Sequence, residues 1–137
     1  MALRFLLDTS VVKRLQYLEV RSVIEPLAAA GELGRPSICD LEVGYSALNA
    51  REWDQLVGAL DAFQAVDITA AHLRRALQVQ RLLAARSQRG RKIPDLLIAA
   101  AAEELEAIVL HYDADFDLIG SVTGQRCQWV VPAGSTP

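Results

Sequence analysis

Apolar and polar positions along the chain follow two different periods. Short apolar runs at residues 4–7, 65–68, 107–112 and 128–131, with a shorter segment around Ser37, predict β-strands. Between them lie longer segments in which apolar residues recur every three or four positions, as in residues 51–63, and this spacing predicts amphipathic helices. Further helices are expected at residues 9–18, 20–30, 40–50, 69–86 and 94–106.

Strands that alternate with helices predict an α/β fold, with three layers (α/β/α) around a central, mostly parallel sheet of four to five short strands. In such sheets, ligands bind beyond the carboxyl ends of the strands. A chain of 137 residues is expected to be a single domain, residues 1–137, in which 131–137 form a flexible tail. The apolar runs are shorter than the roughly 20 residues that a membrane span needs, so no membrane partner is expected.

Charge is unevenly distributed, although the net charge is only −3. No acidic residue occurs between Ile68 and Pro94, whereas seven of the fourteen basic residues lie there: Arg74, Arg75, Arg81, Arg86, Arg89, Arg91 and Lys92. The two cysteines, Cys39 and Cys127, have no metal-binding spacing, and we expect both to be reduced thiols in a cytoplasmic protein.

Four acidic residues fall where a site is expected. Asp8 ends the first strand and Asp113 follows the strand at 107–112, while Glu42 and Asp95 lie near the starts of two helices. Strand ends and helix starts meet at one edge of a parallel sheet, and four carboxylates gathered there require a cation to stay ionised. Oxygen ligands without His or Cys select a hard ion, Mg²⁺ or Mn²⁺.

Each of these acids also has a purely structural interpretation. Asp8 can cap the helix that begins at Thr9, Asp95 can complement the dipole of its own helix, and Glu42 taken alone is typical of a solvated helix residue. Asp117 is interpreted as a turn residue. A calcium loop beginning at Asp113 is excluded, because its sixth and twelfth positions are Leu118 and Gly124 instead of Gly and a carboxylate.

The segments FLLDTSVV, ICDLEVGYSAL, IPDLLIAAAA and HYDADFDLI together resemble a PIN domain, specifically a VapC-type toxin of bacterial toxin–antitoxin pairs. The resemblance covers about residues 3–131. It implies a PIN-like fold and a Mg²⁺-dependent ribonuclease that is homodimeric and is neutralised by a cognate VapB-type antitoxin. The catalytic acids of the family correspond in order to Asp8, Glu42, Asp95 and Asp113.

The resemblance and the residue types together predict a role for each of the four acids. Asp8, Asp95 and Asp113 are expected to hold the metal, Asp113 directly or through water, and Glu42 to orient or deprotonate the attacking water. The hydroxyl of Thr9 or of Ser10, both next to Asp8, is expected either to hold the second carboxylate oxygen of Asp8 or to cap the helix.

His111 departs from the family pattern, which usually has Thr at that position. This leaves open whether Asp115 shares the role of Asp113. A lone histidine at the end of a buried strand is more often packed than catalytic.

The acid-free stretch offers a path for RNA phosphates. Arg86, Arg89, Arg91 and Lys92 lead along the chain towards Asp95 and are expected to bind RNA. The alternative for the helical arginines is an ordinary solvated helix face.

Two other functions compete with the nuclease. A haloacid-dehalogenase-like phosphohydrolase also begins with a strand-end Asp, but its second Asp would stand where this chain has Ser10. A non-catalytic interaction module of the same fold would not need four intact acids. The helices at 9–18 and 20–30 carry more apolar residues than one sheet face needs, which predicts antitoxin binding and dimerisation.

Overall fold

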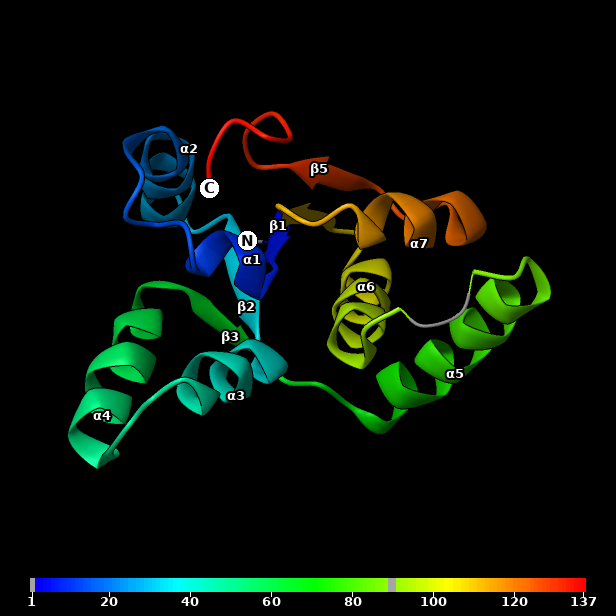
Figure 1. Ribbon diagram of the computed structural model, residues 1–137, viewed down its shortest axis with the longest axis horizontal. Coiled ribbons are helices and arrows are strands. Elements are labelled where there is room, and N and C mark those ends of the chain that lie inside the picture. Colours follow the sequence, from blue (N-terminus) through cyan, green and yellow to red (C-terminus); the bar gives the residue numbers. More distant parts are fainter. Residues whose placement is uncertain (1, 89–90) are drawn as a thin grey trace.

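A parallel sheet of five short strands organises the part of the chain that the computed structural model describes, residues 2–88 and 91–137 (Figure 1). The strand order is β3-β2-β1-β4-β5, and all four neighbouring pairs are parallel. The strands are β1 (Phe5–Leu7), β2 (Leu33–Pro36), β3 (Gln64–Val66), β4 (Ile108–His111) and β5 (Cys127–Trp129). The predicted α/β fold with a parallel sheet is confirmed.

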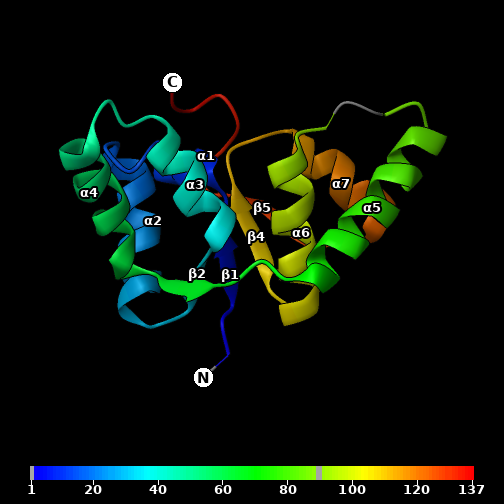
Figure 2. The same cartoon turned by 90° about the horizontal axis from the view of Figure 1, so that it is seen from below.

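Helices connect the strands and cover both faces of the sheet (Figures 1 and 2). They are α1 (Thr9–Val12), α2 (Leu18–Ala29), α3 (Ser37–Tyr45), α4 (Ala50–Gly58), a 3₁₀ turn η1 (Ala59–Ala62), α5 (Ala70–Ala85), α6 (Ile93–Leu105) and α7 (Asp115–Thr123). Helices α5, α6 and α7 lie on one side of the sheet, whereas α2 and α4 lie on the other (Figure 1). This arrangement is the predicted three-layer α/β/α architecture.

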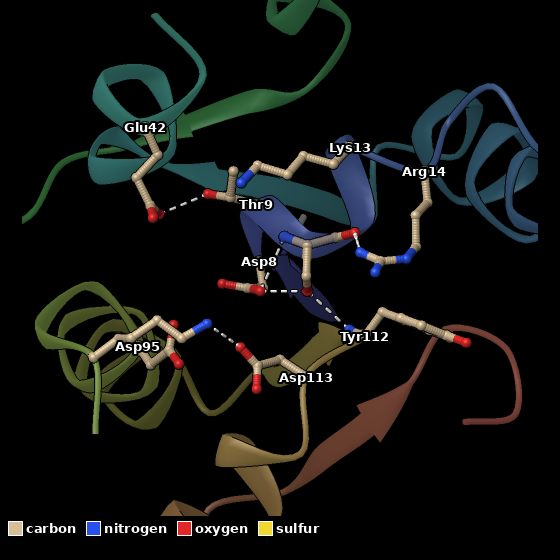
Figure 3. A pocket seen from close by; sticks show the side chains of 10 residues that line it. Asp8, Thr9, Lys13, Arg14, Glu42, Asp95, Tyr112 and Asp113 are labelled. Carbon is tan, nitrogen blue, oxygen red and sulfur yellow. Dashed lines mark hydrogen bonds and ion pairs between the residues drawn. The ribbon is translucent and has the colours of Figure 1, made fainter. Parts of the chain in front are cut away.

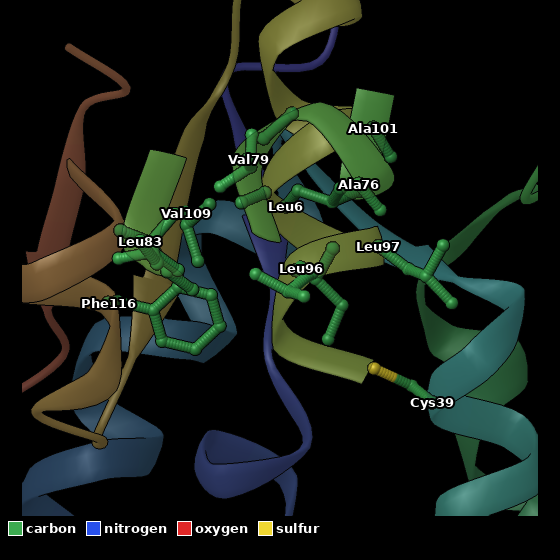
Figure 4. Close-up of a cluster of buried hydrophobic side chains, with 14 residues drawn as sticks. Leu6, Cys39, Ala76, Val79, Leu83, Leu96, Leu97, Ala101, Val109 and Phe116 are labelled. Atoms are coloured by element: carbon green, nitrogen blue, oxygen red, sulfur yellow. The ribbon is translucent and has the colours of Figure 1, made fainter. Parts of the chain in front are cut away.

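Two hydrophobic clusters fill the space between the sheet and the helices. Successive residues of a strand point to opposite faces, so Leu6 of β1 joins the cluster under α5, α6 and α7, while Phe5 and Leu7 join the cluster under α1 and α2. The first cluster contains Phe116, which is fully buried (Figure 4). The central strands β1 and β4 are therefore packed on both faces, and the site residues that follow them stand on a rigid base.

Helix α6 is buried over most of its length, from Asp95 to Ala102 without interruption. Its run of alanines lets it approach both the sheet and α5 closely (Figure 4). The helix ends at Leu105, and the next residue, Glu106, adopts the left-handed conformation with φ 55°. This geometry directs the chain into β4, with the Ala107 N–H donating to Ala102 O at 2.9 Å.

The first predicted helix, residues 9–18, is wrong in length. Helix α1 ends at Val12, and the chain then turns through residues 13–17 with short-range bonds such as Arg14 N–H to Val11 O before α2 begins at Leu18. The turn redirects the chain so that α2 lies against the sheet, where Val20 and Ile24 are buried. A continuous helix would carry these two residues away from the core.

Three further boundaries differ from the sequence prediction. The strand expected around Ser37 is β2, which ends at Pro36, and Ser37 begins α3. The helix expected at 51–63 ends at Gly58 and gives way to η1. The run from Asp115 onwards forms helix α7 with Asp117 in its first helical turn, so the interpretation of Asp117 as a turn residue outside a helix is wrong. Acidic residues suit the first turn because the helix dipole is positive there.

Apolar exposure is also distributed differently from the prediction. On α5, the helical spacing of Leu73 and Leu77 with Ala76 and Leu83 predicts that all four point inward, but Leu73 and Leu77 are 53% and 66% exposed. Val79 is buried in their place. In the segments at 9–18 and 20–30, Val11, Val20 and Ile24 are buried in the second cluster, whereas other apolar residues are only partly buried against it or, like Leu18, exposed. Part of the apolar surplus predicted there is therefore core.

The C-terminal segment was expected to be a flexible tail, but it folds back against the domain. Val131 and Thr136 are buried. The Tyr112 hydroxyl donates to Thr136 O at 3.0 Å, and Arg14 Nε donates to Pro137 O at 3.0 Å. Among the described residues, no helix is long and apolar enough to cross a membrane.

Candidate active site

A polar cleft of about 250 Å³ opens at the carboxyl ends of β1 and β4 (Figure 3). This is the edge at which parallel α/β sheets place their ligands. All four acids predicted as catalytic line it. The lining residues are Asp8, Thr9, Ser10, Lys13, Arg14, Glu42, Lys92, Asp95, Tyr112 and Asp113.

Asp8 is both the cap of α1 and a lining residue of the cleft. Its Oδ2 accepts the Ser10 N–H at 3.0 Å and also the Ser10 hydroxyl. Both bonds use one oxygen, and within the described residues Oδ1 accepts no hydrogen bond from the protein. The Ser10 hydroxyl in turn accepts the Tyr112 N–H at 2.9 Å, which ties the end of β1 to the end of β4. Burial raises the pKa of Asp8, and Glu42 and Asp113 raise it further.

Glu42 reaches the cleft from α3 on the other side of α1. The Thr9 hydroxyl donates to Glu42 Oε1 at 2.7 Å, and this bond fixes the carboxylate beside Asp8 (Figure 3). Ser10 thus bonds to Asp8, whereas Thr9 bonds to Glu42 instead of Asp8, and Asp8 itself caps the helix.

Asp95 lies in the first turn of α6 and is 4% exposed. Its Oδ2 is buried and has no hydrogen-bond partner within the described residues. Burial raises the pKa of Asp95 to about 8, with further contributions from Asp8 and Asp113. A buried carboxylate without partners is costly unless a proton or a cation neutralises it.

Asp113 and Asp115 each form an ion pair with a basic residue that precedes α6. Lys92 Nζ lies 2.6 Å from Asp113 Oδ2, and Arg91 Nη1 lies 2.7 Å from Asp115 Oδ1. Although burial acts to raise it, the pKa of Asp113 is lowered, because the Lys92 ammonium and the Asp115 N–H both donate to this carboxylate. The same ion pair raises the pKa of Lys92.

Oxygens of Asp95, Asp113 and Asp115 lie within 4.8 Å of one another, a spacing that fits one metal ion. Asp8 lines the same cleft but is outside this group, so Asp115 has a stronger claim as a ligand than the sequence suggested. The all-oxygen donor set and the unpartnered Oδ2 of Asp95 fit a hard divalent cation.

His111 is fully buried and does not line the cleft. Its Nδ1 accepts the Asp113 N–H at 3.2 Å, and its ring packs between Phe116 and Trp129. Burial lowers its pKa, so the neutral form is favoured. His111 therefore orients the backbone of Asp113 and packs, in agreement with the non-catalytic interpretation.

Of the residues predicted to bind RNA, only some lie at the site in the part of the chain that the structure describes. Arg91 and Lys92 lie at the site, both paired with acids, whereas Arg86 is exposed at the end of α5 and is not among the cleft residues. Arg89 lies outside the described residues. Lys13, Arg14 and Tyr112 also line the cleft but were not predicted from the sequence. The available signal for Lys13 and Arg14 was their position less than two helical turns after Asp8.

Comparison with known proteins matches residues 5–121 to the model of the PIN domain. The chain belongs to the PIN domain family. This PIN domain is 67% identical over 135 residues to ribonuclease VapC51 of Mycobacterium tuberculosis, with 98% of each chain covered. It is 41% identical over 138 residues to ribonuclease VapC21 of the same species, covering 98% of this chain and 99% of the relative.

The fold agrees with solved structures at low sequence identity. A DNA-bound VapBC structure from Salmonella typhimurium matches with a TM-score of 0.77 at 19% identity, covering 94% of this chain and 99% of the other. VapBC2 from Rickettsia felis bound to a promoter DNA fragment matches with a TM-score of 0.76 at 17% identity, covering 92% and 98%. These likenesses support the PIN fold. Membership of the PIN domain family replaces the haloacid-dehalogenase alternative.

Proposed function

We propose that this PIN domain is a metal-dependent ribonuclease of the VapC type, which hydrolyses phosphodiester bonds of RNA. The observation that carries the proposal is the convergence of Asp8, Glu42, Asp95 and Asp113, from four separate elements, on one polar cleft. The name ribonuclease of relatives at 67% and 41% identity supports the same activity.

The metal is proposed to be Mg²⁺, with Mn²⁺ able to substitute, because the donors are all oxygens. Asp8, Asp95 and Asp113 would hold the ion, and Asp115 would complete the set. When bound there, the ion would polarise the scissile phosphate and lower the pKa of a bound water. Glu42, fixed by Thr9, orients the attacking water and accepts its proton, and Ser10 keeps Asp8 turned towards the cleft.

The partners follow from the same family. We expect a cognate VapB-type antitoxin to neutralise the enzyme, and the chain to form a homodimer. The matching VapBC structures and the exposed Leu41, Tyr45 and Leu48 near α3 are consistent with a partner-covered surface. Light scattering of the purified protein, alone and with its antitoxin, measures both associations, and a stable monomer that binds no antitoxin would contradict them. The two free thiols fit a reducing, cytoplasmic location.

The deciding experiment is cleavage of total RNA with Mg²⁺, with Mn²⁺ and with excess chelator. The proposal expects cleavage with either ion and none in chelator. A non-catalytic PIN module would bind partners but leave RNA intact under all three conditions, and equal cleavage with and without chelator would exclude the metal site.

A further inference from the structure

Among the described residues, three basic side chains line the catalytic cleft, and two of them already form bonds within the protein. Lys92 is paired with Asp113 at 2.6 Å. Arg14 donates from Nη1 to Ser10 O at 2.8 Å and from Nε to Pro137 O, and its guanidinium lies 4.3 Å from the centroid of the Tyr112 ring. Arg14 therefore joins the site to the C-terminal segment, and Lys92 neutralises an acid.

Lys13 is different. Within the described residues its ammonium forms neither an ion pair nor a side-chain hydrogen bond, and the side chain is exposed. Figure 3 shows it extended past Thr9 over the side of the cleft where Glu42 lies, across Asp8 from Asp113. Its backbone is well fixed, because the N–H donates to Thr9 O at 3.0 Å and closes α1.

Helix α1 places Lys13 close to the acids. Lys13 lies at the C-terminal end of this four-residue helix, five residues after its N-cap Asp8, and its backbone keeps the helical conformation with φ −63° and ψ −14°. The backbone of Lys13 is therefore fixed within one short element of the reacting carboxylates.

The electrostatics of the cleft call for such a group. An RNA strand is a polyanion, and the cleft presents four carboxylates, of which a metal ion compensates those nearest the reacting phosphate. The neighbouring phosphates still meet negative charge unless a cation faces them. An exposed lysine is usually only solvated, but an unpaired lysine beside four acids has an unusually favourable position for this contact.

We infer that Lys13 is a substrate-positioning residue, which binds an RNA phosphate adjacent to the scissile one on the Glu42 side of the cleft. The inference rests on the proposed ribonuclease function and adds one contact to it. It predicts that the RNA backbone crosses the site along a path from Lys92, past the acids, to Lys13.

The test compares Lys13→Met with Lys13→Arg and with Arg126→Met. Arg126 is a suitable control because it is exposed and precedes β5, at the opposite end of the sheet from the cleft. Binding of a fluorescein-labelled, mixed-sequence single-stranded RNA is measured by anisotropy in chelator over a range of salt concentrations. Cleavage kinetics of the same RNA are measured with Mg²⁺, and binding of Mn²⁺ alone is measured by paramagnetic resonance.

We expect Lys13→Met to weaken RNA binding roughly fivefold to tenfold. The slope of log K against log salt should shrink by about 0.7, the value for one phosphate contact on a single strand. KM should rise by more than kcat falls, while Mn²⁺ affinity and the thermal midpoint stay unchanged. Lys13→Arg should restore binding, and Arg126→Met should behave as the wild type.

An unchanged affinity and salt slope in Lys13→Met, with wild-type RNA binding intact, would overturn this inference and leave the ribonuclease proposal standing. Equal losses in Lys13→Met and Arg126→Met would also overturn it, because they would indicate a general charge effect. Failure of the wild type to bind or cleave RNA would overturn the proposed function, and the inference with it.

Discussion

Asp8 combines two roles at the scale of the single residue, because one of its oxygens caps α1 while the carboxylate faces the cleft. Asp8→Asn separates them, since the amide oxygen still accepts the two bonds from Ser10. We expect the variant to keep its thermal midpoint in chelator, or to gain slightly because a repelling charge has gone. Its ribonuclease activity should fall by orders of magnitude. Full activity would reduce Asp8 to a helix cap.

The acids at 113, 115 and 117 share one segment but differ in surroundings. Asp113 and Asp115 lie within metal-binding distance of Asp95, whereas Asp117 is exposed and only accepts from Trp129 Nε1 at 3.4 Å. We expect cleavage to be nearly abolished in Asp113→Asn, reduced in Asp115→Asn and unchanged in Asp117→Asn. Mn²⁺ titration of the three variants should give the same ranking of affinities, and a critical Asp117 would mean that the site is misassigned.

Asp95 makes the metal-free protein sensitive to pH. Its pKa of about 8 in the folded state exceeds the ordinary 3.8, so the folded protein holds a proton that the unfolded chain releases between these values. Proton binding by Asp95 therefore stabilises the folded state fully below about pH 4, and this stabilisation is lost as the pH rises through about 8. Denaturant titrations in chelator should therefore give a free energy of unfolding that falls from pH 5 to pH 8, and Asp95→Asn should flatten the profile.

At the scale of elements, the junction between the start of α6 and the start of α7 is closed by two ion pairs, Arg91–Asp115 and Lys92–Asp113. The Lys92 ammonium binds Asp113 Oδ2, an oxygen that a metal ion would also bind, so Lys92→Met removes a competing cation. An exposed pair of this kind contributes at most about 1 kcal/mol, so we expect Mg²⁺ affinity to rise by up to about fivefold. Calorimetric titration measures this, and weaker Mg²⁺ binding in the variant would mean that Lys92 positions Asp113 instead.

The elements also differ in how far the sequence predicted them. The helix capped by Thr69 and the buried strand before Asp113 were predicted to within two residues, because capping residues and apolar runs are local signals. The end of α1 and the start of α7 were not, since Val11 and Leu15 continue a helical spacing through a tertiary turn, and Asp115 and Asp117 resemble loop residues. The four acids were identified from their places at strand ends and helix starts, whereas the position of Lys13 at the cleft depends on how α1, α3 and α6 pack together.

At the scale of the whole molecule, the proposed catalytic residues and the connecting segments lie at opposite ends of the strands. The carboxyl ends of β1 and β4 carry Asp8 and Asp113, while the opposite edge carries Arg126 and the connection from α6 into β4. Changes at that opposite edge are therefore expected to alter stability without altering the cleft.

The left-handed Glu106 lies at this distal edge, and it marks a place where the protein can be engineered. The left-handed conformation destabilises a residue with a Cβ by about 1 kcal/mol, whereas glycine adopts it freely. Glycine also makes the unfolded chain more flexible, which offsets part of this gain. We expect Glu106→Gly to raise the free energy of unfolding by up to about 1 kcal/mol in chemical denaturation, with cleavage rates equal to those of the wild type. A lower midpoint would show that the Glu106 side chain contributes more than its backbone costs. A gain would provide a sturdier host for catalytic-site variants, whose own losses of stability would then be tolerated.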